Sequence, residues 1–419
     1  MAVRGFFHGS QLAQIKQPMS MVPKCGSCGF YKECESPKMK PEGRGRKSIL
    51  IVSSFPGIEE DNRGKQLIGN ASREVQRALA KHNVDIKSDC VLTNALICRP
   101  PVKGKELLTD KVTNNHVEWC RPNLIKTIKE MDPSVIILIG QEATTSVIGW
   151  LWKQNPGAIG KWAGWTIPSQ ELNAWICPTY NPTYVLRELQ GKYKNPIPRL
   201  LYERHLGQAV ALAGTRPWEE VPNWCDDVEI VYDTDRAAKI LRRMISKGGS
   251  VAVDYECNML KPEGEDAQIV SCAVCWNDKK TIAYPWTGAA VEATRELWRS
   301  PLPKIAANAK FEDRWTRKHL KTATRNWYFD TMLGAHAIDS REGTKSLKFQ
   351  SFVELGMGDY NDHIEQFLGS KSSMEKNKID TEIKLSDLLL YNGLDAMLEY
   401  KLARVQMQKI GYPFPEGMK

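Results

Sequence analysis

Residues 250–256 read SVAVDYE, a short apolar run followed by two carboxylates, Asp254 and Glu256. Two more acidic clusters come later: residues 308–313 read NAKFED after an apolar run, and residues 391–395 read YNGLD within an amphipathic stretch. Carboxylates that follow a buried strand, begin a helix and lie on a late helix can converge on one site. Such a cluster suits two divalent cations about 3.5–4 Å apart, which clamp the attacking and leaving oxygens of a phosphodiester.

The bulk composition limits the class of protein. A chain of 419 residues suggests two or three domains, and its 42% hydrophobic and 26% charged residues are typical of a soluble globular protein. The longest apolar run, residues 135–139, is too short to span a bilayer, and the N-terminus lacks the apolar core of a signal peptide. We therefore expect a cytoplasmic protein without a membrane partner, whose eleven cysteines are reduced or bind metal.

Positive charge gathers at the N-terminal end. The net charge is +9, and the first fifty residues hold nine Lys or Arg against three Glu. Residues 38–47 are the densest stretch. Such a segment favours polyanions through counterion release, although a solvated, flexible basic loop would have the same composition.

The first half alternates between segments typical of strands and of helices. Strands are predicted at 49–52, 91–96, 135–139 and 174–177, and helices at 72–82 and 116–131. This alternation predicts an α/β fold, with a parallel sheet covered by helices on both faces. The polar stretch 213–227 contains two prolines and is the expected linker, after which strand signals restart at 228–232. The expected domains are therefore 1–212 and 228–419.

Four cysteines in the first half form a candidate metal-binding set. Cys25 and Cys28 are separated by two residues, and Cys98 and Cys120 each precede an Arg-Pro pair. Four thiolates suit a [4Fe–4S] cluster or a tetrahedral zinc ion. Cys34 lies six residues after Cys28 and is an alternative ligand.

The sequence around these cysteines resembles the family 4 uracil-DNA glycosylases over roughly residues 22–212. The resemblance rests on Pro56-Gly57, Glu60-Asp61, Gly64 and Gly69, Thr93-Asn94, and the Arg-Pro pairs. It implies a parallel sheet with flanking helices, and a [4Fe–4S] cluster held by Cys25, Cys28, Cys98 and Cys120.

The residues that the resemblance places in the glycosylase pocket depart from the family at three positions. Ser54 occupies the position of the catalytic carboxylate, Leu67 that of the uracil-stacking Phe, and Asn181 that of the motif histidine, whereas Asn94 matches the uracil-reading Asn. Loss of a general base typically costs about 10²–10⁴ in rate. We therefore expect little uracil excision and interpret the domain as a DNA-binding or docking scaffold.

The three acidic clusters resemble the proofreading 3′→5′ exonuclease domain of family A DNA polymerases, the DnaQ-like DEDDy group with an RNase H-like fold, over roughly residues 226–412. The resemblance implies that Asp254 bridges two metal ions and that Glu256 binds the ion that activates water. Oxygen ligands suit Mg²⁺ or Mn²⁺.

The second and third motifs of this family supply the remaining site residues. Glu312 occupies the acid position four residues after Asn308, where the family has Asp, and would reach the second metal ion through water; the adjacent Asp313 is the alternative. In the third motif, Asp395 would complete the metal site and Tyr391 would orient the attacking water. One helical turn separates the two, so both project to one face.

We therefore expect a bacteriophage replication protein, located in the bacterial host cytoplasm, that acts as a 3′-5′ exonuclease on single-stranded or frayed 3′ DNA ends. The sequence ends at residue 419, where family A polymerases continue into a polymerase domain. We accordingly expect no nucleotide transfer by these residues and a separate DNA polymerase as partner. The alternatives are a non-catalytic DNA-binding or processivity subunit and an active uracil-DNA glycosylase. Metal binding and shortening of DNA would distinguish the first alternative from the exonuclease.

Overall fold

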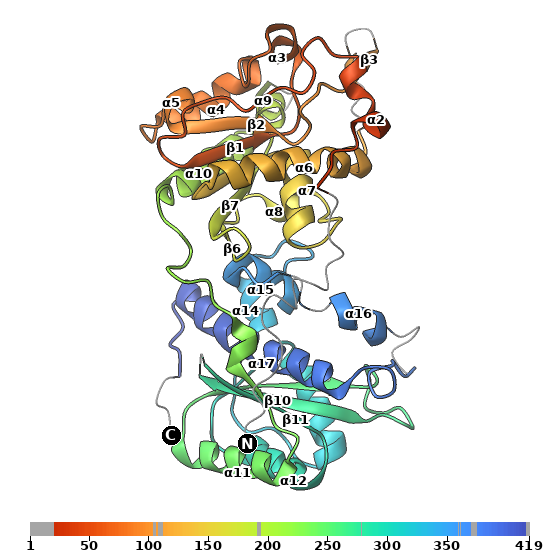
Figure 1. The fold of residues 1–419 in the computed structure, drawn as a ribbon. Coiled ribbons are helices and arrows are strands. Elements are labelled where there is room, and N and C mark those ends of the chain that lie inside the picture. Colours follow the sequence, from red (N-terminus) through yellow and green to blue (C-terminus); the bar gives the residue numbers. More distant parts are fainter. Residues whose placement is uncertain are drawn as a thin grey trace. The chain divides into compact units, whose positions relative to one another are not determined.

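A computed structural model describes residues 21–103, 106–107, 112–190, 194–277, 279–358, 360, 362–369 and 375–415 (Figure 1). The chain forms two compact units. The first contains the described residues up to Val221 together with residues 352–358, and the second contains residues 222–351 and the described residues from Tyr360 onward.

The first unit is built on a five-stranded sheet of order β2-β1-β5-β7-β6. Its strands are β1 (Ile49–Ser53), β2 (Cys90–Asn94), β5 (Val135–Ile139), β6 (Ile167–Ser169) and β7 (Ala174–Thr179). The first four strands in this order are parallel, which confirms the α/β class predicted from the alternation. Strand β6 departs from the predicted parallel sheet and runs antiparallel to β7. The short connection between β6 and β7 cannot make the crossover that parallel strands need.

Helices cover both faces of this sheet. Alternate residues of β1 face opposite sides, and Ile49 and Ile51 pack with α4 (Asn70–Ala80) and α10 (Ile197–Ala211). Helices α6 (Asn114–Met131) and α7 (Gln141–Leu151) pack together, and α7 contacts β1 and β5. The remaining elements are α2 (Cys25–Cys28), η1 (Phe30–Lys32), α3 (Ile58–Arg63), α5 (Ile86–Asp89), β3 (Val102–Lys103), β4 (Glu106–Leu107), α8 (Ile159–Trp162) and α9 (Pro182–Gln190).

The second unit holds a six-stranded mixed sheet of order β13-β12-β9-β10-β11-β8. Its strands are β8 (Val228–Ile230), β9 (Val251–Cys257), β10 (Ile269–Asn277), β11 (Lys280–Pro285), β12 (Lys304–Ala306) and β13 (Trp327–Asp330). Strands β9, β10 and β11 are antiparallel neighbours, whereas the other pairings are parallel. Its helices are α11 (Thr234–Lys247), α12 (Gly288–Arg299), α13 (Ala309–Trp315), α14 (Thr331–Ile338), α16 (Asp362–Leu368) and α17 (Leu385–Ile410), with the helical turns η3 (Trp224–Asp227) and η4 (Thr316–Leu320). Helix α15 (Leu347–Leu355) begins in this unit, and its last residues, from Phe352, belong to the first.

Helix α17 lies across one face of the mixed sheet, opposite α11 and α12, as Figure 1 shows. Gly393 permits this close approach: a Cβ atom there would stand 2.3 Å from Cγ1 of Val228 on β8. Any side chain at this position would push the helix away from the strands. None of the helices in the described part of the chain has the length and apolar content that a membrane span requires.

Lys304 on β12 is a fully buried lysine. Its Nζ donates hydrogen bonds to the backbone oxygens of Ser300, at 2.8 Å, and Leu302, at 2.9 Å. Burial lowers the pKa of Lys304 to about 7, because the charged form is poorly solvated there. A lysine in the unfolded chain keeps its proton up to about pH 10.4.

This depressed pKa predicts a pH-dependent stability. Between the two pKa values the unfolded state binds one proton more, so the free energy of unfolding rises with pH in that window. From about pH 7 to 9.5, the parent protein should gain roughly 3 kcal/mol relative to the Lys304→Met variant. Urea unfolding at the two pH values measures this difference. An equal pH dependence of the two proteins would contradict it.

Candidate functional site

Strand β9 presents two carboxylates on one face. Val251, Val253 and Tyr255 point into the core beneath α11 and α12. Because side chains alternate along a strand, Asp254 and Glu256 point to the opposite face, which α17 covers.

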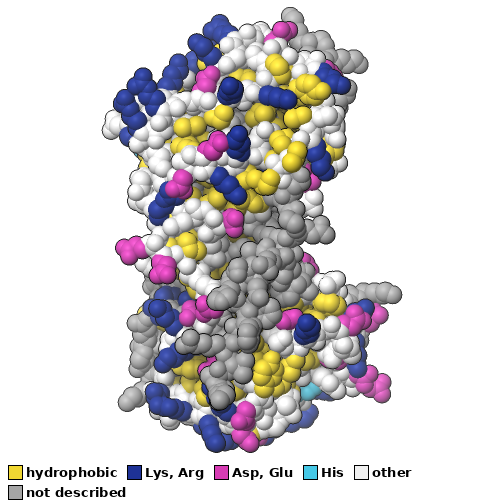
Figure 2. Space-filling model, in the orientation of Figure 1, with side chains coloured by type: hydrophobic (Ala, Val, Ile, Leu, Met, Phe, Trp, Pro, Cys, Tyr) yellow, Lys and Arg dark blue, Asp and Glu magenta, His cyan; other side chains and the backbone are white. Residues whose placement is uncertain are grey.

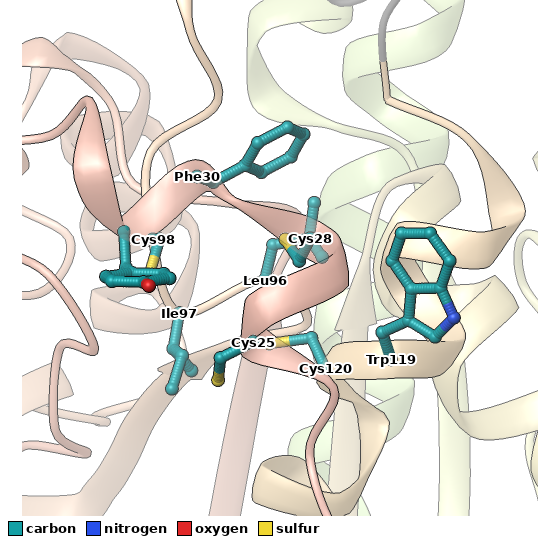
Figure 3. Close-up of a pocket in the computed structure, with 9 residues that line it drawn as sticks. Cys25, Cys28, Phe30, Leu96, Ile97, Cys98, Trp119 and Cys120 are labelled. Carbon is teal, nitrogen blue, oxygen red and sulfur yellow. The ribbon is translucent and has the colours of Figure 1, made fainter.

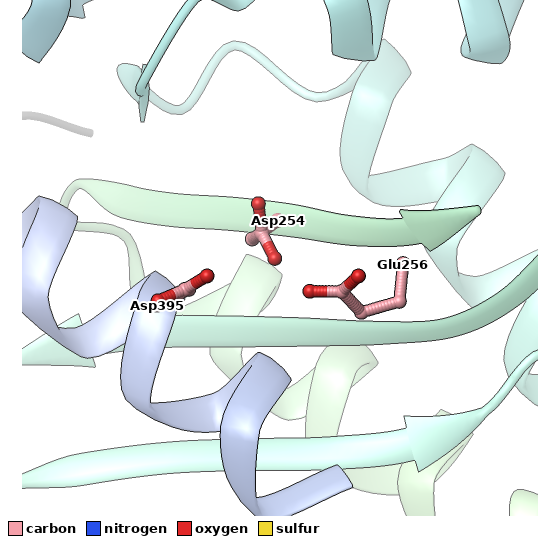
Figure 4. Close-up of side chains that lie close together, drawn as sticks. All are labelled: Asp254, Glu256 and Asp395. Carbon is pink, nitrogen blue, oxygen red and sulfur yellow. The ribbon is translucent and has the colours of Figure 1, made fainter. Parts of the chain in front are cut away.

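Helix α17 brings a third carboxylate to this pair. One ligand oxygen each of Asp254, Glu256 and Asp395 lies within 4.8 Å of the others. Figure 4 shows the three side chains pointing toward one another, two from β9 and one from α17. The site residues expected from the first and third motifs are therefore brought together by the fold, although they are about 140 residues apart in sequence.

Asn392 fixes one of the three carboxylates. Its Nδ2 donates a hydrogen bond of 2.6 Å to Oδ2 of Asp254, and its Oδ1 accepts one of 2.9 Å from Ser271 on β10. The side chain is fully buried. Asn392 thus links α17 to two neighbouring strands and sets the orientation of Asp254.

The acid of the second motif lies near this group but outside the 4.8 Å cluster. Glu312 on α13 is buried, and its Oε2 has no hydrogen-bond partner among the described residues. The adjacent Asp313 instead accepts a bond of 2.6 Å from Arg317. Asp330 holds the start of α13 by accepting from the backbone N–H groups of Asn308 and Ala309. This arrangement favours Glu312 over Asp313 as the site residue.

Three residues near the carboxylates did not emerge from the sequence motifs. Glu399 is 1% exposed, one helical turn beyond Asp395, and that spacing of four was an available signal. Its Oε1 accepts a hydrogen bond from the N–H of Ala307. Lys348 on α15 and Tyr360 both contact Asp395, but no local pattern marks them, because only the fold brings them to the site.

The carboxyl groups of the site disfavour one another's ionisation. Burial raises the pKa of Asp254 and of Glu256 well above the usual range, and the charges of Asp395 and Asp254 respectively add to the effect. Burial, followed by the charge of Asp254, also raises the pKa of Glu312 and of Glu399. Buried like charges of this kind are stabilised by a bound cation, and oxygen ligands fit Mg²⁺ or Mn²⁺.

The cysteine set occupies one pocket of the first unit. Cys25 and Cys28 on α2, Cys98, and Cys120 on α6 line it together with Phe30, Leu96 and Trp119 (Figure 3). Burial raises the pKa of Cys98 to about 12 and that of Cys120 to about 11. These thiols would therefore stay protonated at neutral pH unless a metal centre supplies positive charge.

Cys34 does not line the pocket, although its thiol interacts with that of Cys98. The buried carboxylate of Asp61 on α3 holds the neighbouring segment by accepting from the backbone N–H groups of Glu35 and Ser36. Asp61 thereby positions the chain beside the cysteine pocket.

Ser54 and Asn181 lie next to each other at the carboxyl ends of β1 and β7. A Cβ atom on Gly140 would stand 2.8 Å from Oγ of Ser54 and 3.2 Å from Nδ2 of Asn181. Ser54 donates to the backbone oxygen of Ile139, and Asn181 accepts from the N–H of Thr183 at the start of α9. Neither side chain has a carboxylate or imidazole partner in the described hydrogen bonds.

The side chain of Asn94 forms a hydrogen bond within the protein that the sequence motifs did not reveal. Its Nδ2 donates a 2.6 Å hydrogen bond to Oε1 of Gln66, and both side chains are 2% exposed. Gln66 in turn donates to the backbone oxygen of Lys40. The adjacent Leu67 packs against the core of the unit. One N–H group of the amide expected to read uracil is thus already bonded within the protein.

The basic segment 38–47 is held in place by its backbone. The N–H groups of Arg44 and Arg46 donate to backbone oxygens of Lys87 and Ser88 on α5, while both side chains are exposed. Figure 2 shows Lys and Arg side chains gathered at the margin of this unit near α4 and α5. The backbone of the segment is therefore bonded to α5, while these arginine side chains are available to a polyanion.

Comparison with known proteins agrees with the division of the chain into two units. Residues 41–203 match the family model of the uracil DNA glycosylase superfamily, and residues 228–410 match that of the 3′-5′ exonucleases. The chain thus carries a glycosylase-superfamily domain followed by an exonuclease-family domain.

Relatives resemble one or both parts. A type-4 uracil-DNA glycosylase of Pyrobaculum aerophilum is 28% identical over 183 residues, which cover 42% of this chain and 88% of that protein. The DNA polymerase of Bacillus phage SP01 is 25% identical over 365 residues, covering 80% of this chain but 37% of the polymerase. The solved structure of Brucella melitensis NrnC with bound Mg²⁺ covers 39% of this chain and 75% of its own, with 15% identity and a TM-score of 0.31.

Proposed function

We propose that the second unit is a metal-dependent 3′-5′ DNA exonuclease. The observation that carries the proposal is the approach of Asp254, Glu256 and Asp395 to within 4.8 Å on β9 and α17, inside a domain of the exonuclease family. These carboxylates would hold two Mg²⁺ or Mn²⁺ ions, with Glu312 next to them. When bound, the ions would supply charge stabilisation for the attacking and leaving oxygens of a phosphodiester.

The protein's own residues would orient the reactants. Asn392 holds Asp254, and the Asp254 oxygen not bonded to Asn392 stays available to a ligand. Tyr391 is buried beside Asp395, and burial, followed by the charge of Asp395, raises its pKa. Its phenol therefore keeps its proton at neutral pH and would position the attacking water through its hydroxyl oxygen.

A labelled oligonucleotide tests this function. Purified protein with Mg²⁺ or Mn²⁺ should shorten a 5′-labelled single-stranded DNA stepwise from its 3′ end, and EDTA should stop the reaction. Bound metal without shortening of DNA would instead favour a non-catalytic DNA-binding or processivity subunit.

We propose in addition that Cys25, Cys28, Cys98 and Cys120 hold a [4Fe–4S] cluster. Four thiolates on one zinc ion would lie about 3.8 Å apart, given Zn–S bonds near 2.3 Å. Among the described residues, no three of these sulfur atoms come within 4.8 Å of one another. A cubane, in which each thiolate binds a separate iron, does not require the sulfur atoms to lie so close together. The resemblance of the surrounding sequence to family 4 uracil-DNA glycosylases implies the same four ligands.

We propose that the first unit binds DNA but does not excise uracil, because Ser54 and Asn181 supply neither base nor acid and Gln66 already accepts one N–H of Asn94. An Asp254→Asn protein, which would spare the substrate, should bind DNA in a salt-sensitive manner and leave no abasic sites in uracil-containing oligonucleotides. An active glycosylase serves as the positive control. Alkali-labile cleavage at uracil above the no-enzyme level would contradict the prediction and favour an active glycosylase.

We infer that the protein acts in bacteriophage DNA replication alongside a DNA polymerase activity. The match to a phage polymerase over 80% of this chain supports this context. The exonuclease would then remove mispaired 3′ ends, while the basic surface of the first unit would hold DNA phosphates.

A further inference from the structure

Lys348 makes an unusually close set of contacts with the third motif. Its Nζ lies 2.5 Å from Oδ1 of Asp395 and 2.7 Å from the hydroxyl oxygen of Tyr360. The Tyr360 hydroxyl donates to the same Oδ1 atom. One oxygen of Asp395 therefore takes two donors, which leaves the other oxygen as the one that can face a metal ion.

Aromatic rings hold the ammonium group in this position. Nζ of Lys348 stands 4.0 Å from the ring centre of Tyr360 and 4.2 Å from that of Tyr391. A cation so close to two ring faces is attracted by both. The side chain is 19% exposed and that of Asp395 is 8% exposed, so water screens the ion pair only weakly.

Lys348 also lies within a strongly acidic group of side chains. Five acids gather around the site: Asp254, Glu256, Glu312, Asp395 and Glu399. Among the described residues, Lys348 is the only cation that forms an ion pair with one of these acids, namely Asp395. A buried charge without a partner is costly, so this ammonium contributes to the stability of the metal-free fold.

We propose that Lys348 is a built-in counter-ion of the nuclease site, which shares Asp395 with a divalent cation and thereby weakens the binding of that cation. This inference rests on the proposed exonuclease function. The ammonium repels a divalent ion that approaches the same carboxylate, and it steadies the ring of Tyr391. Lys348 is therefore a positioning residue that lowers metal affinity while keeping Asp395 and Tyr391 in place.

Neutral substitutions should separate these two effects. Lys348→Met keeps the length of the side chain without its charge, and Lys348→Gln keeps a hydrogen-bond donor without the charge. Both should bind Mn²⁺ at least about tenfold more tightly than the parent, because a repelling unit charge a few ångströms away is removed. Lys348→Met should nevertheless hydrolyse DNA more slowly at saturating Mn²⁺, since Asp395 and Tyr391 lose their support.

The test is calorimetric titration of the full-length protein with Mn²⁺ alone, together with thermal unfolding in EDTA. Lys348→Arg, which keeps the charge, and Lys345→Met, which removes a charge three residues away, should keep the parent affinity within about threefold. In EDTA the two neutral variants should unfold at a lower temperature than the parent, and Mn²⁺ should raise that temperature more than it does for the parent. Unchanged or weaker Mn²⁺ binding by both neutral variants would overturn the inference.

Mn²⁺ binding and DNA shortening by the parent protein distinguish a wrong role for Lys348 from a wrong exonuclease function. A parent protein that binds no Mn²⁺ and leaves DNA intact would remove the basis of both. A parent that binds Mn²⁺ and shortens DNA, while the neutral variants bind Mn²⁺ no more tightly, would refute the role of Lys348 alone.

Discussion

Asp254→Asn should lower the rate of 3′-end hydrolysis by a factor of about 10³ or more at saturating Mn²⁺. The charge stabilisation that bound metal supplies is worth several kcal/mol, and each 1.36 kcal/mol corresponds to about tenfold in rate. Asp254 faces both Glu256 and Asp395, so its neutral amide removes the charge at the centre of the proposed metal site. Single-turnover hydrolysis of a labelled oligonucleotide measures the loss.

The fold should survive this change. The asparagine has the shape of the aspartate, and its neutral side chain removes a carboxyl group whose pKa burial raises, as well as its repulsion of Glu256. Thermal unfolding in EDTA should therefore occur at the same or a higher temperature than in the parent. Glu265→Gln neutralises an exposed acid of the same unit and should keep full activity. Hydrolysis by Asp254→Asn at the parent rate would refute the site.

Cys120→Ser should abolish the iron–sulfur cluster. Cys120 lies on α6 and lines the pocket opposite the cysteines of α2. A hydroxyl is a poor substitute for a thiolate ligand, so anaerobically purified protein should fall from about four iron atoms per chain to fewer than one. The unfolding temperature of the first unit should fall as well, because metal binding is coupled to folding.

Cys34→Ser separates the two ligand sets that the sequence allows. Cys34 lies outside the pocket lining, so this variant should retain about four iron atoms and the brown colour of the parent. If Cys34→Ser loses its iron and Cys120→Ser keeps it, then Cys34 is the fourth ligand and Cys120 is not. Stoichiometric zinc without iron in the parent would exclude the cluster and keep the four-thiolate site.

Most strands of the first unit could be predicted from local patterns. The run Val135–Ile139 is a strand with the predicted bounds, because a short, fully buried run of β-branched and leucine residues is typical of a central parallel strand. Helix boundaries were less well defined: the helix expected at 72–82 spans Asn70–Ala80. Strand β6 was not predicted, and neither was its antiparallel direction, since pairing direction depends on a connection that the strand's own residues do not specify.

The sequence by itself determined which side chains are available to the site. The motifs supplied Asp254, Glu256 and Asp395, because the alternation of β9 and the helical spacing of α17 are local properties of the chain. Only the tertiary structure decided which groups surround them. Lys348 and Tyr360 reach Asp395 from α15 and the segment after it, and Gln66 reaches Asn94 across 28 positions. Such contacts depend on the packing of separate elements, where the cost of burying unpaired polar and charged groups selects each partner.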